Sequence, residues 1–74
     1  MTDQKTRDAL AFNLKVWMAI RGYTQKELAQ RAGVKQATVS RFVRGKHAGH
    51  VSTLARLCRA LDCNPNDLLQ GAVR

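Results

Sequence analysis

Residues 25–44, QKELAQRAGVKQATVSRFVR, decide the fold of this chain. They predict two short helices joined by a tight turn. Thr24, directly before the stretch, suits a helix N-cap, and Glu27 three residues later completes the capping-box pattern T-x-x-E. Gly33 follows the last apolar residue of the first helix, where a chain that turns sharply often needs left-handed backbone. We therefore expect one helix to end at Gly33 and a second to begin near Gln36.

The second helix divides into a polar face and an apolar face. At about 100° per residue, one side carries Gln36, Ala37, Ser40, Arg41 and Arg44, while Val39, Phe42 and Val43 share the other. The polar face holds amides, a hydroxyl, guanidinium groups and one methyl group, and no acid. Such groups can recognise base edges in a DNA major groove. The alternative is the solvated outer face that any amphipathic helix presents.

The charge of the chain points to an anionic partner. Thirteen Lys and Arg stand against five Asp and Glu, which gives a net charge of +8 and a pI near 10.6. Solubility or adhesion to acidic membrane would be alternative explanations. The cations concentrate around the second helix, in a segment whose only acid is Glu27. This basic block consists of Lys26, Arg31, Lys35, Arg41, Arg44 and Lys46, and it predicts a positive surface centred on that helix.

The run TQKELAQRAGVKQATVSRFVRGK resembles the lambda-repressor/Cro-like family of helix-turn-helix regulators. The matching positions are a small Ala29 at the helix crossing, Gly33 in the turn, and Val39 and Phe42 as apolar contacts of the recognition helix. Residues 51–69 look like that family's fourth helix and the start of its fifth. The resemblance implies a compact all-α domain of five helices, with the helix-turn-helix at helices 2 and 3. It also implies sequence-specific binding to double-stranded DNA and a homodimer that reads a pseudo-palindrome.

The resemblance also assigns candidate site residues. In phage repressors of this family, a Gln opening helix 2 and a Gln opening the recognition helix clamp an adenine and its phosphate, and Gln25 and Gln36 match these places. The base-contacting set is then Gln36, Ala37, Ser40 and Arg41, with Arg41 expected to contact guanine. Phosphate-binding or supporting roles fall to Gln25, Lys35, Thr38, Arg44, Lys46 and His47. Lys35 is a departure, since relatives often cap this helix with Ser or Thr.

The remaining helices follow from capping and spacing. We expect residues 1–6 to form a flexible arm and residues 7–74 a single domain. Helix 1 is expected over residues 7–21, and helix 4 over residues 52–61 with Arg56 and Arg59 facing outward. Asp62 suits a left-handed turn. Asn64 is expected to cap a fifth helix that begins at Pro65. Ala72 and Val73 could extend that helix.

Two apolar surfaces remain after the core is assigned. One is Phe12, Val16 and Ile20 on helix 1, where relatives usually carry charges; it is either a contact surface or covered by the C-terminal tail. The other is Leu69, Ala72 and Val73. We expect the C-terminal surface to hold the dimer together, because relatives often use that region.

Metal, disulfide and catalytic chemistry are not expected. His47 and His50 precede Cys58 and Cys63, which raises the possibility of zinc, but C-x₄-C lacks a finger spacing. Cys58 also falls in register with a row of leucines and is predicted to be buried and reduced. No cofactor is implied, and without paired catalytic groups the chain is not expected to be an enzyme.

The sequence therefore predicts a transcription regulator, a repressor of phage or mobile-element type. We expect it in the cytoplasm of a prokaryote or phage host, associated with the nucleoid, because neither a signal peptide nor an apolar span is visible. Two alternatives remain. One is an antitoxin, which would add a protein partner to the same domain; the other is a protein-interaction module without specific DNA binding.

Overall fold

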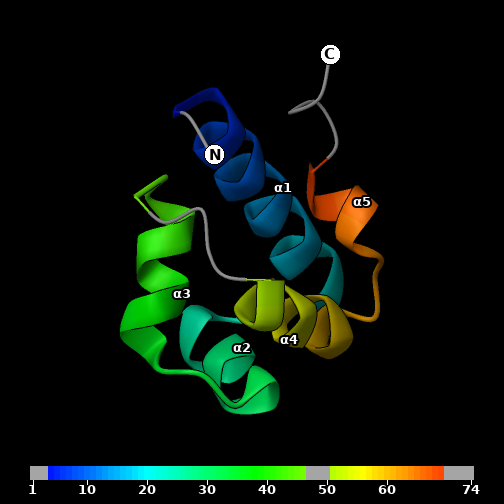
Figure 1. Ribbon diagram of the computed structural model, residues 1–74. Coiled ribbons are helices and arrows are strands. Elements are labelled where there is room, and N and C mark those ends of the chain that lie inside the picture. The colour runs from blue at the N-terminus through cyan, green and yellow to red at the C-terminus, as the bar shows by residue number, and fades with distance from the viewer. Residues whose placement is uncertain (1–3, 47–50, 70–74) are drawn as a thin grey trace.

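The computed structural model describes residues 4–46 and 51–69 and folds them into five α-helices, with no β-strand among them (Figure 1). The all-α, five-helix fold expected from the sequence is confirmed. In chain order the helices are α1 (Gln4–Arg21), α2 (Gln25–Ala32), α3 (Gln36–Val43), α4 (Val51–Leu61) and α5 (Pro65–Leu69).

Helix α1 is the centre of the arrangement. It runs between α3 on one side and α5 on the other, and it also contacts α4 (Figure 1). Helix α2 packs against α3 and α4. Helices α2 and α3 form the predicted helix-turn-helix. Helix α1 packs against α3, and α4 packs against α2.

The ends of α2 follow the local sequence signals. Thr24 Oγ1 accepts a hydrogen bond from the Glu27 backbone N–H at 3.1 Å, and Glu27 Oε1 accepts one from the Thr24 backbone N–H at 2.9 Å. This reciprocal pair is a complete capping box. At the other end, Gly33 adopts φ 71° and ψ 33° and donates its N–H to the Ala29 carbonyl. The predicted cap and the predicted left-handed turn are both confirmed.

In the connection from α4 to α5, the predicted turn at Asp62 and the predicted start of α5 at Pro65 are confirmed. Asp62 has the left-handed φ of 55°. The Asn64 N–H donates to Asp67 Oδ2 at 3.0 Å, so the carboxylate satisfies an otherwise free donor at the start of α5. Helix α4 begins at Val51, one residue before the expected start. The proposed extension of α5 through Ala72 and Val73 lies outside the described residues.

The core is built from the apolar faces of all five helices. Its largest fully buried side chains are Leu10 and Leu14 of α1, Leu28 of α2, Val39 and Phe42 of α3, Leu57 and Leu61 of α4, and Leu68 of α5. Cys58 is buried among them, as its register predicted. Burial of this apolar surface is the main favourable term in a domain of this size.

Helix α1 begins at Gln4, three residues earlier than the sequence predicted. Residues 4–6, which we had expected to belong to the arm, are helical. The Gln4 side-chain amide donates to Asp8 Oδ1 at 2.7 Å and to the Gly45 carbonyl at 3.2 Å. These two bonds tie the first turn to the rest of α1 and to the loop after α3, which explains the longer helix.

None of the helices in the described part of the chain is both long enough and apolar enough to span a bilayer.

Candidate nucleic-acid interface

Helix α3 presents its polar side to solvent. Val39 and Phe42 are buried in the core and Val43 is half-buried. Among the residues predicted to contact bases, Gln36, Ala37 and Arg41 are exposed and Ser40 is half-buried. The four therefore lie on the side of α3 that points away from the core, as the helical spacing required.

The N-terminus of α3 has no side-chain cap. Lys35 occupies the N-cap with extended backbone (φ −74°, ψ 145°), and its side chain makes no capping hydrogen bond. Its carbonyl accepts from the Thr38 N–H at 3.0 Å, which closes the first turn. A cation at this helix end repels the positive end of the macrodipole by a few tenths of a kcal/mol. A phosphate bound here would offset that repulsion.

The other predicted supporting residues surround this helix. Gln25 is the first residue of α2 and is half-buried, as is Thr38. Arg44 is the C-cap of α3, and both Arg44 and Lys46 are exposed. His47, also proposed as a phosphate ligand, lies outside the described residues.

The segment after α3 is held in a way the local sequence did not indicate. Gly45 is buried, with φ 71°, and its carbonyl accepts the hydrogen bond from Gln4. A Cβ at Gly45 would lie 3.1 Å from Asp8 Oδ1, closer than ordinary van der Waals contact. The positive φ favours glycine here, and any larger residue would also have to displace the Asp8 carboxylate slightly. This hydrogen bond from the first turn of α1 holds the segment that follows α3, in which Lys46 lies next to Gly45.

All six cations of the basic block are solvent-exposed. Its single acid, Glu27, is engaged in the capping box, and the hydrogen bonds from Thr24 together with the charge of Arg31 lower the pKa of that carboxyl. Arg31 is also engaged, since its guanidinium lies over the Tyr23 ring at 4.5 Å from the centroid. Helix α3 and its flanks thus carry six exposed cations against the single acid Glu27, and the Asp8 carboxylate of α1 lies beside Gly45 at the edge of this positive surface.

The two cysteines are free thiols. Burial, followed by the neighbouring Cys63, raises the pKa of Cys58 to about 12, so this thiol is neutral at physiological pH. Burial also raises the pKa of Cys63. Within residues 4–46 and 51–69, no group of three His, Cys, Asp or Glu side chains is placed to hold a metal ion.

Comparison with known proteins agrees with this geometry. The sequence profile of the Cro/C1-type HTH DNA-binding domain matches residues 13–70, which include α2, α3, α4 and α5. An HTH-type transcriptional regulator of Bacillus subtilis strain 168, YozG, is 38% identical over 63 residues, which are 84% of this chain and 75% of that protein.

Solved structures of transcription regulators share the fold. A hypothetical transcription factor from Neisseria, NHTF, superposes with a TM-score of 0.85 at 26% identity, over 96% of this chain and 83% of that one. The clp gene regulator ClgR of C. glutamicum gives a TM-score of 0.78 at 29% identity, over 97% and 91% of the two chains. The restriction-modification controller protein C.AhdI of Aeromonas hydrophila gives 0.77 at 25%, over 81% and 91%.

The helix-turn-helix of α2 and α3, the exposed polar face of α3 and these matches lead to one conclusion: the chain belongs to the Cro/C1-type helix-turn-helix family of DNA-binding transcription regulators.

Proposed function

We propose that this protein is a sequence-specific repressor that binds a pseudo-palindromic operator as a homodimer in the cytoplasm of its cell. Bound there, it would block transcription by occupying the DNA. The observation that carries the proposal is the exposed face of α3, which combines hydrogen-bonding groups suited to base edges with flanking cations suited to phosphates.

The proposed division of labour follows from side-chain chemistry. Gln36 can form two hydrogen bonds with adenine, and Arg41 can do the same with guanine. Ala37 offers a methyl group for a thymine methyl, and Ser40 a hydroxyl that serves as donor or acceptor. These residues run from the first residue of α3, Gln36, to Arg41 in its last turn, so a helix inserted in the major groove would present them to neighbouring base pairs.

The phosphate contacts would flank that helix on both sides. Lys35 and Gln25 stand at the N-termini of α3 and α2, where backbone N–H groups also favour an anion. Arg44 and Lys46 stand at the C-terminal end of α3 and are exposed. Contacts from both ends of one helix would fix its register on the duplex without themselves reading sequence.

A dimer is proposed because one such domain contacts too few base pairs. A single recognition helix reads about half an operator, which gives too little discrimination against the many competing sites of a genome. Two copies related by a two-fold axis would read half-sites about one helical turn apart.

The test is a selection of bound duplexes from random DNA, with the wild-type protein and with Gln36→Ala in parallel. The proposal expects an inverted repeat from the wild-type protein, and in the variant the loss of preference at one position in each half-site. Lys26→Ala, a charge removal outside the face of α3, serves as the control and should return the wild-type consensus. Binding without any enriched sequence would overturn the proposal in favour of a module that uses its basic face only for solubility or non-specific association.

A further inference from the structure

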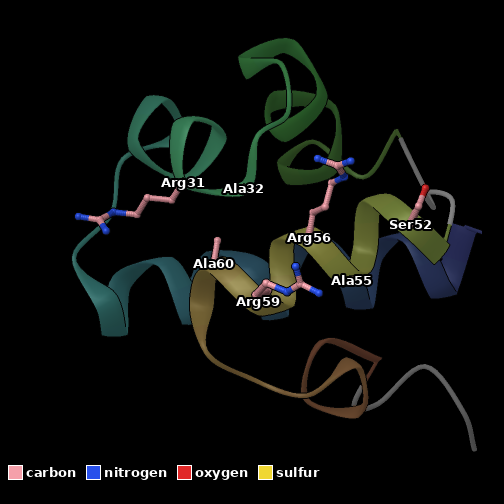
Figure 2. A pocket seen from close by; sticks show the side chains of 7 residues that line it. All are labelled: Arg31, Ala32, Ser52, Ala55, Arg56, Arg59 and Ala60. Atoms are coloured by element: carbon pink, nitrogen blue, oxygen red, sulfur yellow. The ribbon is translucent and has the colours of Figure 1, made fainter.

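Helices α2 and α4 leave a cleft of about 500 Å³ between them (Figure 2). Small side chains produce it: Ala32 of α2, and Ala55 and Ala60 of α4, stand where larger residues would close the space. Its volume lies within the range of small-molecule sites, about 300–1,000 Å³. None of the residues predicted to contact DNA lines this cleft.

The polar groups of the cleft are cationic or neutral. Arg31, Arg56, Arg59 and Ser52 line it, and no Asp or Glu does. On α4, Ser52, Arg56 and Arg59 follow the spacing i, i+4, i+7, so they form one row along the helix. Both arginines carry a positive charge on neighbouring turns of one helix, so an anion would be favoured beside them.

The guanidinium groups of Arg56 and Arg59 meet no hydrogen-bond acceptor within residues 4–46 and 51–69. Arg21 provides a contrast, because it donates to the Leu61 carbonyl at 2.7 Å and to the Asp62 carbonyl at 3.2 Å. Arg21 therefore has a structural task at the end of α4, whereas the two cleft arginines keep their donors available to a ligand.

The side chains are placed differently along the cleft. Figure 2 shows Arg56 extending away from α4, Arg59 lying beside that helix, and Arg31 extending from α2 away from both of them. Arg56 Nη1 lies 3.3 Å from the position that a Cβ of Gly33 would occupy, so it reaches across to the turn between α2 and α3. Because Arg31 is stacked on Tyr23, Arg56 and Arg59 are the residues that could hold a ligand.

We propose that this cleft binds a small molecule that carries a diphosphate group. A guanidinium presents a planar fork of donors that matches phosphate oxygens, and two arginines that line one cleft could each take one of two linked phosphates. The Ser52 hydroxyl adds a third donor. The methyl groups of Ala55 and Ala60 supply an apolar surface for the organic part of the molecule.

The probe is inorganic pyrophosphate, titrated into the isotopically labelled protein with ionic strength held constant by chloride. The measurement is the change in amide resonances of α2 and α4. Arg56→Gln combined with Arg59→Gln removes the proposed ligands, and Lys5→Gln combined with Lys15→Gln removes the same charge from exposed positions of α1. All four positions are exposed, so both variants should remain folded, and thermal unfolding checks this.

The proposal expects saturable changes in the wild-type protein, with pyrophosphate affinity at least about tenfold weaker in the arginine variant and unchanged in the lysine variant. Arg59→Lys, which keeps the charge and loses the fork, should also bind more weakly. The proposal is overturned if all the proteins bind pyrophosphate with the same affinity, or if the spectral changes do not saturate.

A second experiment measures the affinity of the same proteins for the selected DNA duplex. If the arginine variant loses only its affinity for DNA, the two arginines contact DNA phosphates and there is no diphosphate site. The pyrophosphate arm does not depend on the proposed repressor function, so the two can fail separately.

Discussion

Gln36 and Arg41 are the side chains on which the proposed base recognition depends. Both are exposed on α3, and neither helps to fill the core. Removing either one should therefore leave the fold intact and change only what the helix can read. We expect Gln36→Ala and Arg41→Ala each to relax base preference at one position per half-site, at a cost of about 1–3 kcal/mol against the preferred base. Competition binding with singly substituted duplexes measures this.

Lys46→Ala is the matched comparison. It removes a cation that is proposed to contact phosphate, so affinity should fall about equally for every duplex. If Gln36→Ala bound all the substituted duplexes in the wild-type order, the helix face proposed to read bases would be the wrong one.

The reactivity of the Cys58 thiol tests whether this side chain is buried in the core. Its side chain is 4% exposed, and burial raises its pKa to about 12, so the reactive thiolate is scarce below that pH. In a Cys63→Ser background, a thiol reagent at neutral pH should modify Cys58 slowly in the native protein and quickly in denaturant. Cys58→Ala should lower the free energy of unfolding by about 1–2 kcal/mol because it opens a small cavity. Duplex preference should not change, and fast labelling of the native thiol would contradict the core assignment.

At the scale of single elements, the capping box of α2 should make stability depend on pH. The pKa of Glu27 is lowered by its hydrogen bonds with Thr24 and by Arg31, so the ionised carboxylate is the form that stabilises the fold. This contribution is present above the unfolded-state pKa and is lost as the pH falls through the lowered folded-state pKa. The difference in unfolding free energy between wild type and Glu27→Gln should therefore shrink on acidification.

Urea unfolding at a series of pH values measures that difference. Thr24→Ala is the companion variant, because it removes the other half of the box at a cost of about 1 kcal/mol. A stability gap between wild type and Glu27→Gln that stayed constant from neutral to strongly acidic pH would show that the carboxylate does not support the cap.

Local signals predicted α2, its caps and the turn because each depends on residues three to five apart. Thr24 and Glu27 form one hydrogen-bonded unit, and Gly33 and Asp62 each mark a turn through their own backbone preference. The start of α1 could not be predicted in this way. It depends on Gln4 meeting the Gly45 carbonyl, 41 residues away, and the sequence gives no local sign that these two residues are neighbours.

The same distinction applies to the candidate sites. The polar face of α3 follows from helical periodicity within one element, so the sequence was sufficient to place Gln36, Ala37 and Arg41 on the outside. Arg56 and Arg59 were likewise expected to face outward. That they border a cleft depends on how α2 packs against α4 and on the small side chains between them, which becomes visible only in the folded chain.

For the whole molecule, the excess of positive charge should make DNA binding strongly dependent on salt. If the basic block supplies about three to five phosphate contacts per subunit, a dimer releases about 6–10 counterions, and the slope of log K against log salt concentration lies near about −5 to −9. Fluorescence anisotropy with the selected duplex at several salt concentrations gives this slope. A slope shallower than about −2 would rule out binding across the groove by two subunits.

The described end of α5 lies beside α1, the helix that carries the exposed apolar residues Phe12, Val16 and Ile20. Asn13 Nδ2 of α1 donates to the Leu68 carbonyl at 2.9 Å, so the chain reaches the end of α5 beside Asn13. Ile20, Val16 and Phe12 are displaced from Asn13 by about 20°, 60° and 100° around α1, and they are 60%, 40% and 65% exposed. Phe12 is thus the member of the helix 1 stripe that is turned furthest around α1 from Asn13, which contacts the end of α5. It is the residue that best separates the two candidate dimer interfaces.

We expect the C-terminal residues to form the interface, because the family resemblance places dimer contacts there and Leu69 and Val73 are apolar. Leu69→Glu combined with Val73→Glu would bury like charges at the two-fold axis, where the same surface meets itself, and should give a folded monomer. The monomer should bind the operator much more weakly, because each half-site must then be occupied independently. Phe12→Glu should leave the dimer intact.

Sedimentation of both variants measures their oligomeric state, and circular dichroism verifies that they are folded. If Phe12→Glu were monomeric while the Leu69/Val73 double variant stayed dimeric, the interface would lie on α1 instead. The two α3 helices of the dimer would then be arranged differently, and the spacing of the operator half-sites would differ with them.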